Sequence, residues 1–181
     1  DNFPLVYSRC AGVQATVIGT AGNDPLIMGT AGADVIMGLA GDDTIRAMGG
    51  TDVVCAGDGD DRVIGGFGAD TLYGEAGADR LAGNAGEDVL VGGAGDDKAN
   101  GGLDDDVVSG GDDADIIRGG PGNDTLEGNA GDDRIYGLGD DDTITGGDGD
   151  DCVNGGFGVD TVSGDAGNDL VAGGGGEDTL H

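Results

Sequence analysis

The chain has little of what stabilises an ordinary globular domain. Tryptophan is absent, aromatic residues make up 3%, and only 7 of 181 residues are Lys or Arg. With 37 acidic residues the formal net charge is −30. This charge disfavours nucleic acid and anionic membranes as partners, because both are polyanions. No apolar stretch approaches the roughly 20 residues that a membrane helix needs. By itself this composition is typical of a disordered chain.

Residues with catalytic chemistry are equally scarce. The single histidine is His181, the last residue, so neither a catalytic triad nor a histidine metal site can be assembled. We therefore expect that the chain is not an enzyme. No signal peptide opens it, because Asp1 leads directly into a short mixed segment. We expect a mature form or an expressed part of a longer chain.

What the chain has in excess is glycine, 44 residues, arranged with a strict nine-residue period. Residues 29–181 are seventeen nine-residue units without insertion; residues 19–27 form one more unit, and Met28 is a single extra residue between them. The sixth position is Asp in all eighteen units, and the fourth is Gly in fifteen. The eighth is Leu, Ile or Val in seventeen, with Ala99 as the exception. Order of this kind argues against disorder and excludes low-complexity drift.

The unit reads G-x-x-G-x-D-x-U-x, where U is a bulky aliphatic residue. It resembles the calcium-binding nonapeptide repeat of RTX (repeats-in-toxin) proteins, which assigns residues 19–181 to a repeat domain and residues 1–18 to an N-terminal cap segment. The opening is similar to that of the small secreted RTX calcium-binding proteins of actinobacteria, since Cys10-Ala11-Gly12 leads into Ala15-Thr16-Val17-Ile18-Gly19-Thr20, with Val54-Cys55 three units later. The resemblance implies a secreted, extracellular protein that folds on calcium.

The repeat itself predicts an all-β fold, a right-handed parallel β-roll. Positions seven to nine form a three-residue strand with one inward aliphatic side chain. Six glycine-rich residues then turn the chain through φ > 0 conformations that a side chain would penalise. Two units make one coil, so successive strands fall on two opposed parallel sheets, and nine coils give a rod roughly 43 Å long. Its thin aliphatic core is too small to offset the lost chain entropy.

The recurring aspartates offer the missing stabilisation. The sixth-position Asp of one loop should lie beside the Asp eighteen residues on, so that Asp34 stacks with Asp52 and Asp43 with Asp61. Ca²⁺ prefers about six to eight hard oxygen ligands, and glycine turns expose main-chain carbonyls beside these carboxylates. Nine loops on each edge allow at most sixteen interloop sites, whose +32 would nearly cancel the −30 of the chain. The predicted metal ligands are Asp24, Asp34, Asp43, Asp52, Asp61, Asp70, Asp79, Asp88, Asp97, Asp106, Asp115, Asp124, Asp133, Asp142, Asp151, Asp160, Asp169 and Asp178.

The aspartates allow two other interpretations. An Asp in a loop often serves as a turn or capping residue without any metal, but eighteen in one register favour calcium. EF-hands are excluded because their D-x-[DN]-x-[DN]-G-x₅-E pattern is missing. Three units carry Asp instead of Gly at the fourth position, where Asp tolerates left-handed geometry only moderately well. We therefore expect distorted sites around Asp106, Asp115 and Asp142.

The two outer faces of the predicted roll differ in charge. Solubilisation of an acidic rod is one interpretation of the cations that gather on one face; docking of that face onto an acidic surface or glycan is the other. Six of the seven basic residues fall on this face: Arg46, Arg62, Arg80, Lys98, Arg118 and Arg134.

The opposite face carries a threonine column at the seventh position. Flat, evenly spaced hydroxyl and methyl groups are what an ice-binding surface needs, although threonine is also simply a good strand residue. The ninth position on the same strands is irregular, with Glu127, Thr145, Ser163 and His181. The column itself is Thr125, Thr143, Thr161 and Thr179.

The three cysteines are informative by their placement. Cys55 and Cys152 lie on opposite faces over five coils apart, too far to bridge. Cys10 precedes a degenerate unit that would cap the first coil near Cys55. The resemblance also implies a Cys10–Cys55 disulfide, which fits an oxidising compartment; two unrelated free thiols are the alternative. Cys152 is left as an odd, exposed thiol, and a dimer could form through it or through a flat sheet face.

The leading interpretation is a secreted calcium-binding structural or adhesion-like module. Calcium ions are the only partner that the sequence identifies, and a protein, glycan or ice partner is left open. One alternative is an ice-binding (antifreeze) protein that uses the threonine face. Another is the calcium-folding C-terminal module of a larger secreted enzyme, since resembling domains follow secreted proteases and lipases.

Overall fold

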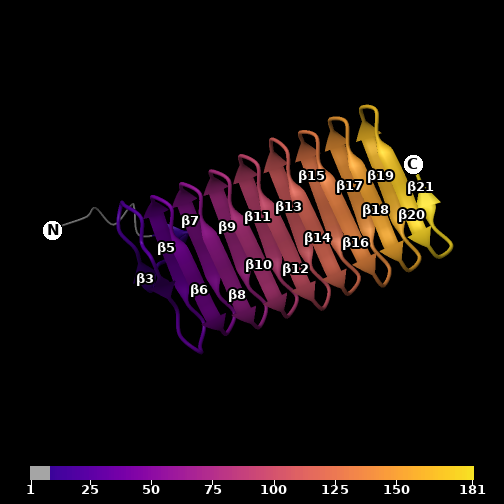
Figure 1. The fold of residues 1–181 in the computed structure, drawn as a ribbon. Helices are drawn as coiled ribbons and strands as arrows, with labels where there is room; N and C mark the ends of the chain where they lie inside the picture. The colour runs from indigo at the N-terminus through magenta and orange to yellow at the C-terminus, as the bar shows by residue number, and fades with distance from the viewer. Residues whose placement is uncertain (1–8) are drawn as a thin grey trace.

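The protein is a rod of β-strands joined by tight turns (Figure 1). A computed structural model describes residues 9–181, so residues 1–8 of the expected cap segment lie outside the described residues. Successive strands alternate between two opposed sheets, and the strands within each of these sheets are parallel. Over the described range all elements are strands. The predicted all-β parallel roll is confirmed.

We call the two long sheets the odd sheet and the even sheet, after their strand numbers. A short antiparallel pair, β1 (Arg9–Cys10) and β2 (Val13–Gln14), precedes them. The odd sheet contains β3 (Val17–Ile18), β5 (Val35–Ala40), β7 (Val53–Asp58), β9 (Thr71–Ala76), β11 (Val89–Ala94), β13 (Val107–Asp112), β15 (Thr125–Ala130), β17 (Thr143–Asp148), β19 (Thr161–Ala166) and β21 (Thr179–Leu180). The even sheet contains β4 (Ile27–Met28), β6 (Thr44–Gly49), β8 (Arg62–Phe67), β10 (Arg80–Ala85), β12 (Lys98–Leu103), β14 (Ile116–Pro121), β16 (Arg134–Gly139), β18 (Cys152–Phe157) and β20 (Leu170–Gly175).

The strands are longer than the three residues that the repeat predicts. From β5 to β20 each strand has six residues, running from the seventh position of one unit to the third position of the next. Positions two and three pair with the next coil as well, as Gly93 does with Gly111 and Ala94 with Asp112. This pairing satisfies main-chain groups that a longer loop would leave without partners. The turns are therefore only three residues long.

The core is a single layer of eighth-position side chains between the sheets. From Ile36 to Val162 these side chains are at most 3% exposed. At the open C-terminal end the layer loses its cover: Val171 is only partly buried and Leu180 is 50% exposed. The predicted core is thus confirmed over the interior coils and frays at the last one.

The first unit departs from the predicted register. Leu26, at its eighth position, is 48% exposed, whereas Ile27 is 6% exposed and pairs with Ile45. Met28 pairs with Arg46 inside β4, so it is not a spacer between units as expected. The extra residue is accommodated before Ile27, because an aliphatic side chain must meet the core layer at that rung.

A disulfide between Cys10 and Cys55 fixes the start of the roll and confirms the predicted pair. It joins β1 to β7 across a Cα–Cα distance of 5.6 Å. Cys152 has a free thiol, as predicted, but it is partly buried rather than exposed. In β18 it lies between Arg134 and Leu170, its partners on the two neighbouring strands.

Candidate calcium-binding loops

The sixth-position aspartates form a continuous hydrogen-bonded ladder along each edge of the rod. The backbone N–H of Asp70 donates to Oδ1 of Asp88 at 2.7 Å, and the backbone N–H of Asp88 donates to Oδ1 of Asp106 at 2.8 Å. The same bond, 2.7–3.0 Å long, recurs for every donor from Asp34 to Asp160. The stacking of aspartates eighteen residues apart is therefore confirmed.

The second carboxylate oxygen of these residues has no partner. In fourteen consecutive units, from Asp43 to Asp160, Oδ2 is buried and makes no hydrogen bond. All fourteen residues are at most 2% exposed. A buried charged oxygen without a partner is strongly unfavourable. This pattern, repeated fourteen times, indicates that these oxygens belong to sites for a cation.

The first-position glycine makes room for this oxygen. A Cβ atom on Gly65 would lie 2.5 Å from Oδ2 of Asp70 and 3.0 Å from the carbonyl oxygen of Gly83. The φ of Gly65 is not in the left-handed region, so its role is close approach rather than a turn. Left-handed geometry occurs instead at the fourth position, as at Gly59 with φ 130°. The repeat therefore uses its two glycines for different purposes.

Burial sets the electrostatics of the stacked carboxyls. At Asp61, Asp70 and Asp106 burial raises the pKa to about 7, against a backbone hydrogen bond that lowers it. The neighbouring carboxylates of the same ladder raise these pKa values further. At Asp34 the balance differs, since the hydrogen bond from the backbone N–H of Thr30 lowers its pKa. The interior ladder therefore disfavours its own ionised form in the absence of a counter-charge.

The three units with Asp at the fourth position keep their stacked aspartates in place. Their φ values at that position are left-handed, between 73° and 77°. The ladder bonds that Asp106, Asp115 and Asp142 accept are nevertheless 2.8–2.9 Å long, as in other units. The aspartate ladder is therefore regular in these units, although we expected distorted sites around them.

Strain appears instead in the main chain of those units. In regular coils the fourth-position N–H donates to the third-position carbonyl of the next coil over 2.7–3.0 Å. The bonds from Gly86 and Gly95 into the altered units are stretched to 3.3 Å. Within the described chain, Asp104, Asp113 and Asp140 make no such bond. The loss is local and lies outside the buried ladder.

A second ladder on the outside of the turns was not predicted. At the fifth position, Oδ1 of Asp60 accepts the backbone N–H of Ala78 at 3.0 Å, and Oδ1 of Asp132 accepts that of Asp150 at 2.9 Å. These side chains are exposed. The sequence does carry a signal for this ladder, because Asp or Asn holds the fifth position in ten of eighteen units.

The donor set around the stacked loops fits calcium. Across residues 9–181, no three His, Cys, Asp or Glu side chains gather around one point. Side chains alone therefore cannot surround an ion, and main-chain oxygens of the turns must complete its shell. Ca²⁺ accepts such a mixed set of carboxylate and carbonyl oxygens. The buried Oδ2 atoms without hydrogen bonds indicate where such an ion would bind.

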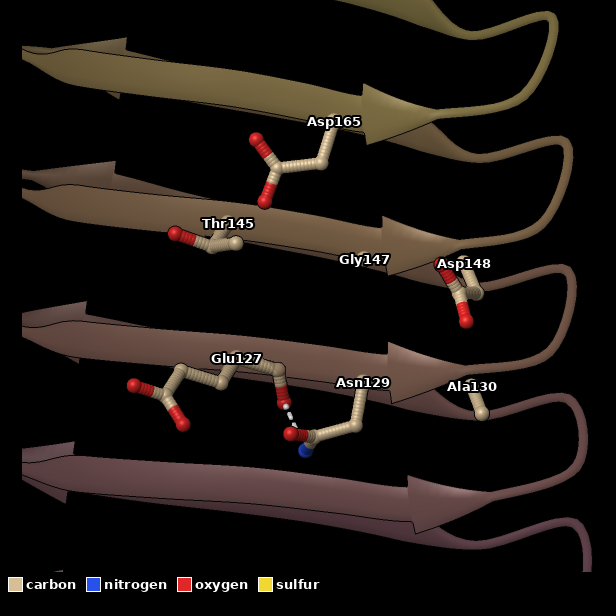
Figure 2. Close-up of a pocket in the computed structure, with 7 residues that line it drawn as sticks. All are labelled: Glu127, Asn129, Ala130, Thr145, Gly147, Asp148 and Asp165. Carbon is tan, nitrogen blue, oxygen red and sulfur yellow. Dashed lines mark hydrogen bonds between the residues drawn. The ribbon is translucent and has the colours of Figure 1, made fainter.

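The outer faces match the predicted distribution of cations. All six predicted cations lie exposed on strands of the even sheet. On the odd sheet the threonine column is in register, Thr125 opposite Thr143 and Thr143 opposite Thr161. Beside it lies a shallow hollow where Glu127 and Asp165 project from the sheet (Figure 2). The acidic side chains interrupt the regular array that the ice-binding alternative requires.

Comparison with known proteins completes this description. No helix within residues 9–181 is long and apolar enough to cross a membrane. No curated protein sequence matches the chain. The family model of the RTX calcium-binding nonapeptide repeat matches it over residues 28–63, 56–90, 82–117, 91–126, 118–153, 127–162 and 154–181. Together these matches span the chain from residue 28 to its last residue, and the chain therefore belongs to the RTX calcium-binding nonapeptide repeat family as a calcium-binding β-roll.

Proposed function

We propose that the chain is a secreted structural or adhesion-like module whose roll forms when its stacked loops bind calcium. The observation that carries this proposal is the series of fourteen buried Oδ2 atoms without hydrogen bonds. A protein with a net charge of −30 gains little from ordering these carboxylates next to one another unless a cation joins them. Metal binding of this kind contributes directly to folding.

The chain's own residues prepare each site. The backbone N–H of one Asp holds Oδ1 of the next, which leaves Oδ2 turned toward the first-position glycine. Bound Ca²⁺ would supply positive charge between adjacent loops. The eighteen sixth-position aspartates, Asp24 to Asp178, are the proposed ligands, with at most sixteen interloop sites.

We also propose that the roll has no catalytic activity of its own. The only histidine, His181, is exposed at the end of the chain. The interior sixth-position carboxyls are tied into ladders and buried, so they cannot exchange protons with a substrate.

Secretion and a structural role have separate support. Proteins with RTX repeats are typically secreted, and the Cys10–Cys55 disulfide fits an oxidising compartment. A rod with two broad, exposed sheet faces offers surface for binding rather than an enclosed pocket for a small molecule.

A calcium titration followed by circular dichroism tests the proposal. At neutral pH in excess chelator the chain should be largely disordered, and strand signal should appear near about 10⁻⁴–10⁻³ M Ca²⁺, as for extracellular calcium modules. Mg²⁺ is a suitable control, because it requires near-octahedral geometry and retains its waters, and it should not induce the strand signal. An equal strand signal in chelator would contradict the proposal.

A further inference from the structure

The outer face of the even sheet contains no acidic residue in any strand from β4 to β20. In a chain with 37 acidic residues, this face instead carries six exposed cations and several exposed apolar side chains. None of the six cations makes an ion pair with a described carboxylate. Phe67 is 77% exposed, Phe157 78% and Leu103 53%. A surface rich in Arg, aromatic and aliphatic residues and free of Asp and Glu has the composition of a protein–protein interface.

The odd sheet has the complementary composition. Its strands carry all the acidic residues found within strands of the two long sheets: Asp58, Glu75, Asp112, Glu127, Asp148 and Asp165. Its seventh-position column is mostly Val and Thr, and Val89 and Val107 are 37% and 47% exposed. The charges on the two faces are thus of opposite sign.

The coil places these complementary columns at the same edges of the rod. Each odd strand ends where a three-residue turn leads into the next even strand (Figure 1). At one edge, Asp58 at the end of β7 is followed by Arg62 at the start of β8, and Glu75 in β9 by Arg80 in β10. At the other edge the strand ends are apolar, because Leu103 ends β12 and Val107 begins β13, and the acidic side chains Asp104 and Asp105 lie in the turn between them.

We propose that copies of this chain stack face to face, with the even sheet of one copy on the odd sheet of the next in the same orientation. In this arrangement the cationic column of one copy faces the acidic column of the next at one edge. At the other edge Phe67 and Leu103 face the Val and Thr column. The inference rests on the calcium-folded roll proposed above, because only the folded chain presents these faces.

The size of the face is sufficient for a stable contact. Six-residue strands make it roughly 20 Å wide, and eight such strands at about 4.8 Å each make it roughly 40 Å long. Each partner would thus contribute about 800 Å², the standard size for specific protein interfaces. Because the two contacting faces are different, the contact does not close and produces an open stack.

Stacking also relieves repulsion within each copy. Arg62 and Arg80 are direct neighbours on adjacent strands, an unfavourable like-charge pair. Asp58 and Glu75 lie on the neighbouring strands β7 and β9. Burial and the Asp58 charge raise the pKa of Glu75. A second copy would give both pairs partners of opposite charge.

Sedimentation velocity of the full chain in saturating Ca²⁺ tests the stack, with circular dichroism to verify that each sample is folded. The wild type should form concentration-dependent assemblies that dissociate as salt is raised, because the interface is charged. The variant R62E/R80E should be monomeric, and so should D58R/E75R, because in each variant the two contacting faces carry charges of the same sign. An equimolar mixture of the two variants should assemble again, because every contact between unlike copies is complementary. The control E87R/E177R changes the net charge as D58R/E75R does, but on exposed turns, and should still assemble.

The possible outcomes separate this inference from the proposed function. A folded, calcium-bound wild type that stays monomeric at all concentrations overturns the stack and leaves the calcium-folded module intact. Assembly that is unaffected by either charge reversal, or a mixture that fails to assemble, also overturns it. A chain that does not fold in calcium contradicts the proposed function, and the stack with it.

Discussion

At the scale of the residue, each position of the repeat has a distinct physical task. The sixth-position Asp was predictable because its register is unbroken, and its stacking follows from an eighteen-residue coil. The tasks of the glycines were only partly predictable. Their spacing suggests turns, but the contact between Gly65 and Oδ2 of Asp70 depends on side-chain placement that no sequence pattern records.

The second position is the least predictable of all. It requires left-handed geometry, yet side chains occupy it in several units, with φ 94° at Leu39 and 88° at Met48. Such residues are strained by about 1–2 kcal/mol. Gly or Asn at this position in many units does indicate left-handed geometry. The glycines at neighbouring positions make this preference hard to recognise in the sequence.

Relief of this strain gives a first prediction. Leu138 has φ 92° and is 45% exposed, so L138G should stabilise the roll by about 0.5–1 kcal/mol after the entropy of glycine is subtracted. The matched control is L103G, at an exposed leucine with ordinary φ, which should destabilise by a similar amount. Denaturation midpoints in saturating Ca²⁺, at concentrations where the chain is monomeric, measure both changes. Equal signs for the two variants would contradict the strain argument.

The stacked aspartates give a second prediction. Asp88 accepts from Asp70 and donates to Asp106, whereas Asp178 accepts only from Asp160 and has no following loop in this chain. D88A should therefore remove close to two bound ions and interrupt the stack. D178A should remove at most one and fray only the end, since repeat arrays lose stability locally. Equilibrium dialysis with calorimetry counts the ions, and equal losses would favour one independent ion per loop.

At the scale of the element, the strands follow the repeat closely in the middle of the chain and depart from it where the repeat is interrupted. Their direction, order and inward side chains could be predicted from the period alone. Their length could not, because positions two and three look like loop until they pair with the next coil. The pairing of β12 with β14 is shorter than most, with three residue pairs instead of five. Pro121 lies at the missing end of that ladder, where a residue without an N–H cannot donate.

The same pair of strands contains the weakest point of the core. Ala99 in β12 lies between Leu81 and Ile117 and is 3% exposed. A99V should raise stability by about 1 kcal/mol, because it adds buried methyl groups where the layer is thinnest. V153A, the reverse change at an intact rung, should lower it by about 1–3 kcal/mol. Thermal unfolding in saturating Ca²⁺ measures both. Substantial destabilisation by A99V would mean that the sheets approach more closely at this rung.

At the scale of the whole molecule, repetition makes the fold predictable and the ends difficult. Seventeen units in fixed register place equivalent residues at equivalent positions of every coil. The two sheets, the two edges of the rod and the cationic face could therefore be predicted from the sequence. The first unit could not be predicted, because the extra residue can be placed on either side of Ile27 without changing the pattern. The acid-free even face could not be predicted, because positions two and three have the composition of a loop.

The charge of the molecule produces the last prediction, on the ion-free chain. The interior carboxyls have pKa values raised by burial, to about 7 at Asp61 and Asp106 and about 6 at Asp79, against about 3.9 in an unfolded chain. The folded state therefore binds more protons than the unfolded state between these values, so stability falls as pH rises. In excess chelator the roll should be most stable below about pH 4 and lose that stability as pH approaches about 7.

Calcium should reverse this dependence, because protons then compete with the ion for the same oxygens. Circular dichroism in chelator should show more strand at about pH 5 than at about pH 7.5, and the calcium needed for folding should rise as pH falls. D79N, which mimics the protonated side chain, should fold more readily than the wild type in chelator at neutral pH and bind fewer ions in calcium. If the calcium-free chain is equally disordered and soluble at both pH values, neutralising the carboxylates is not sufficient to fold the roll. Calcium would then be required for the bonds it forms between loops as well as for its charge.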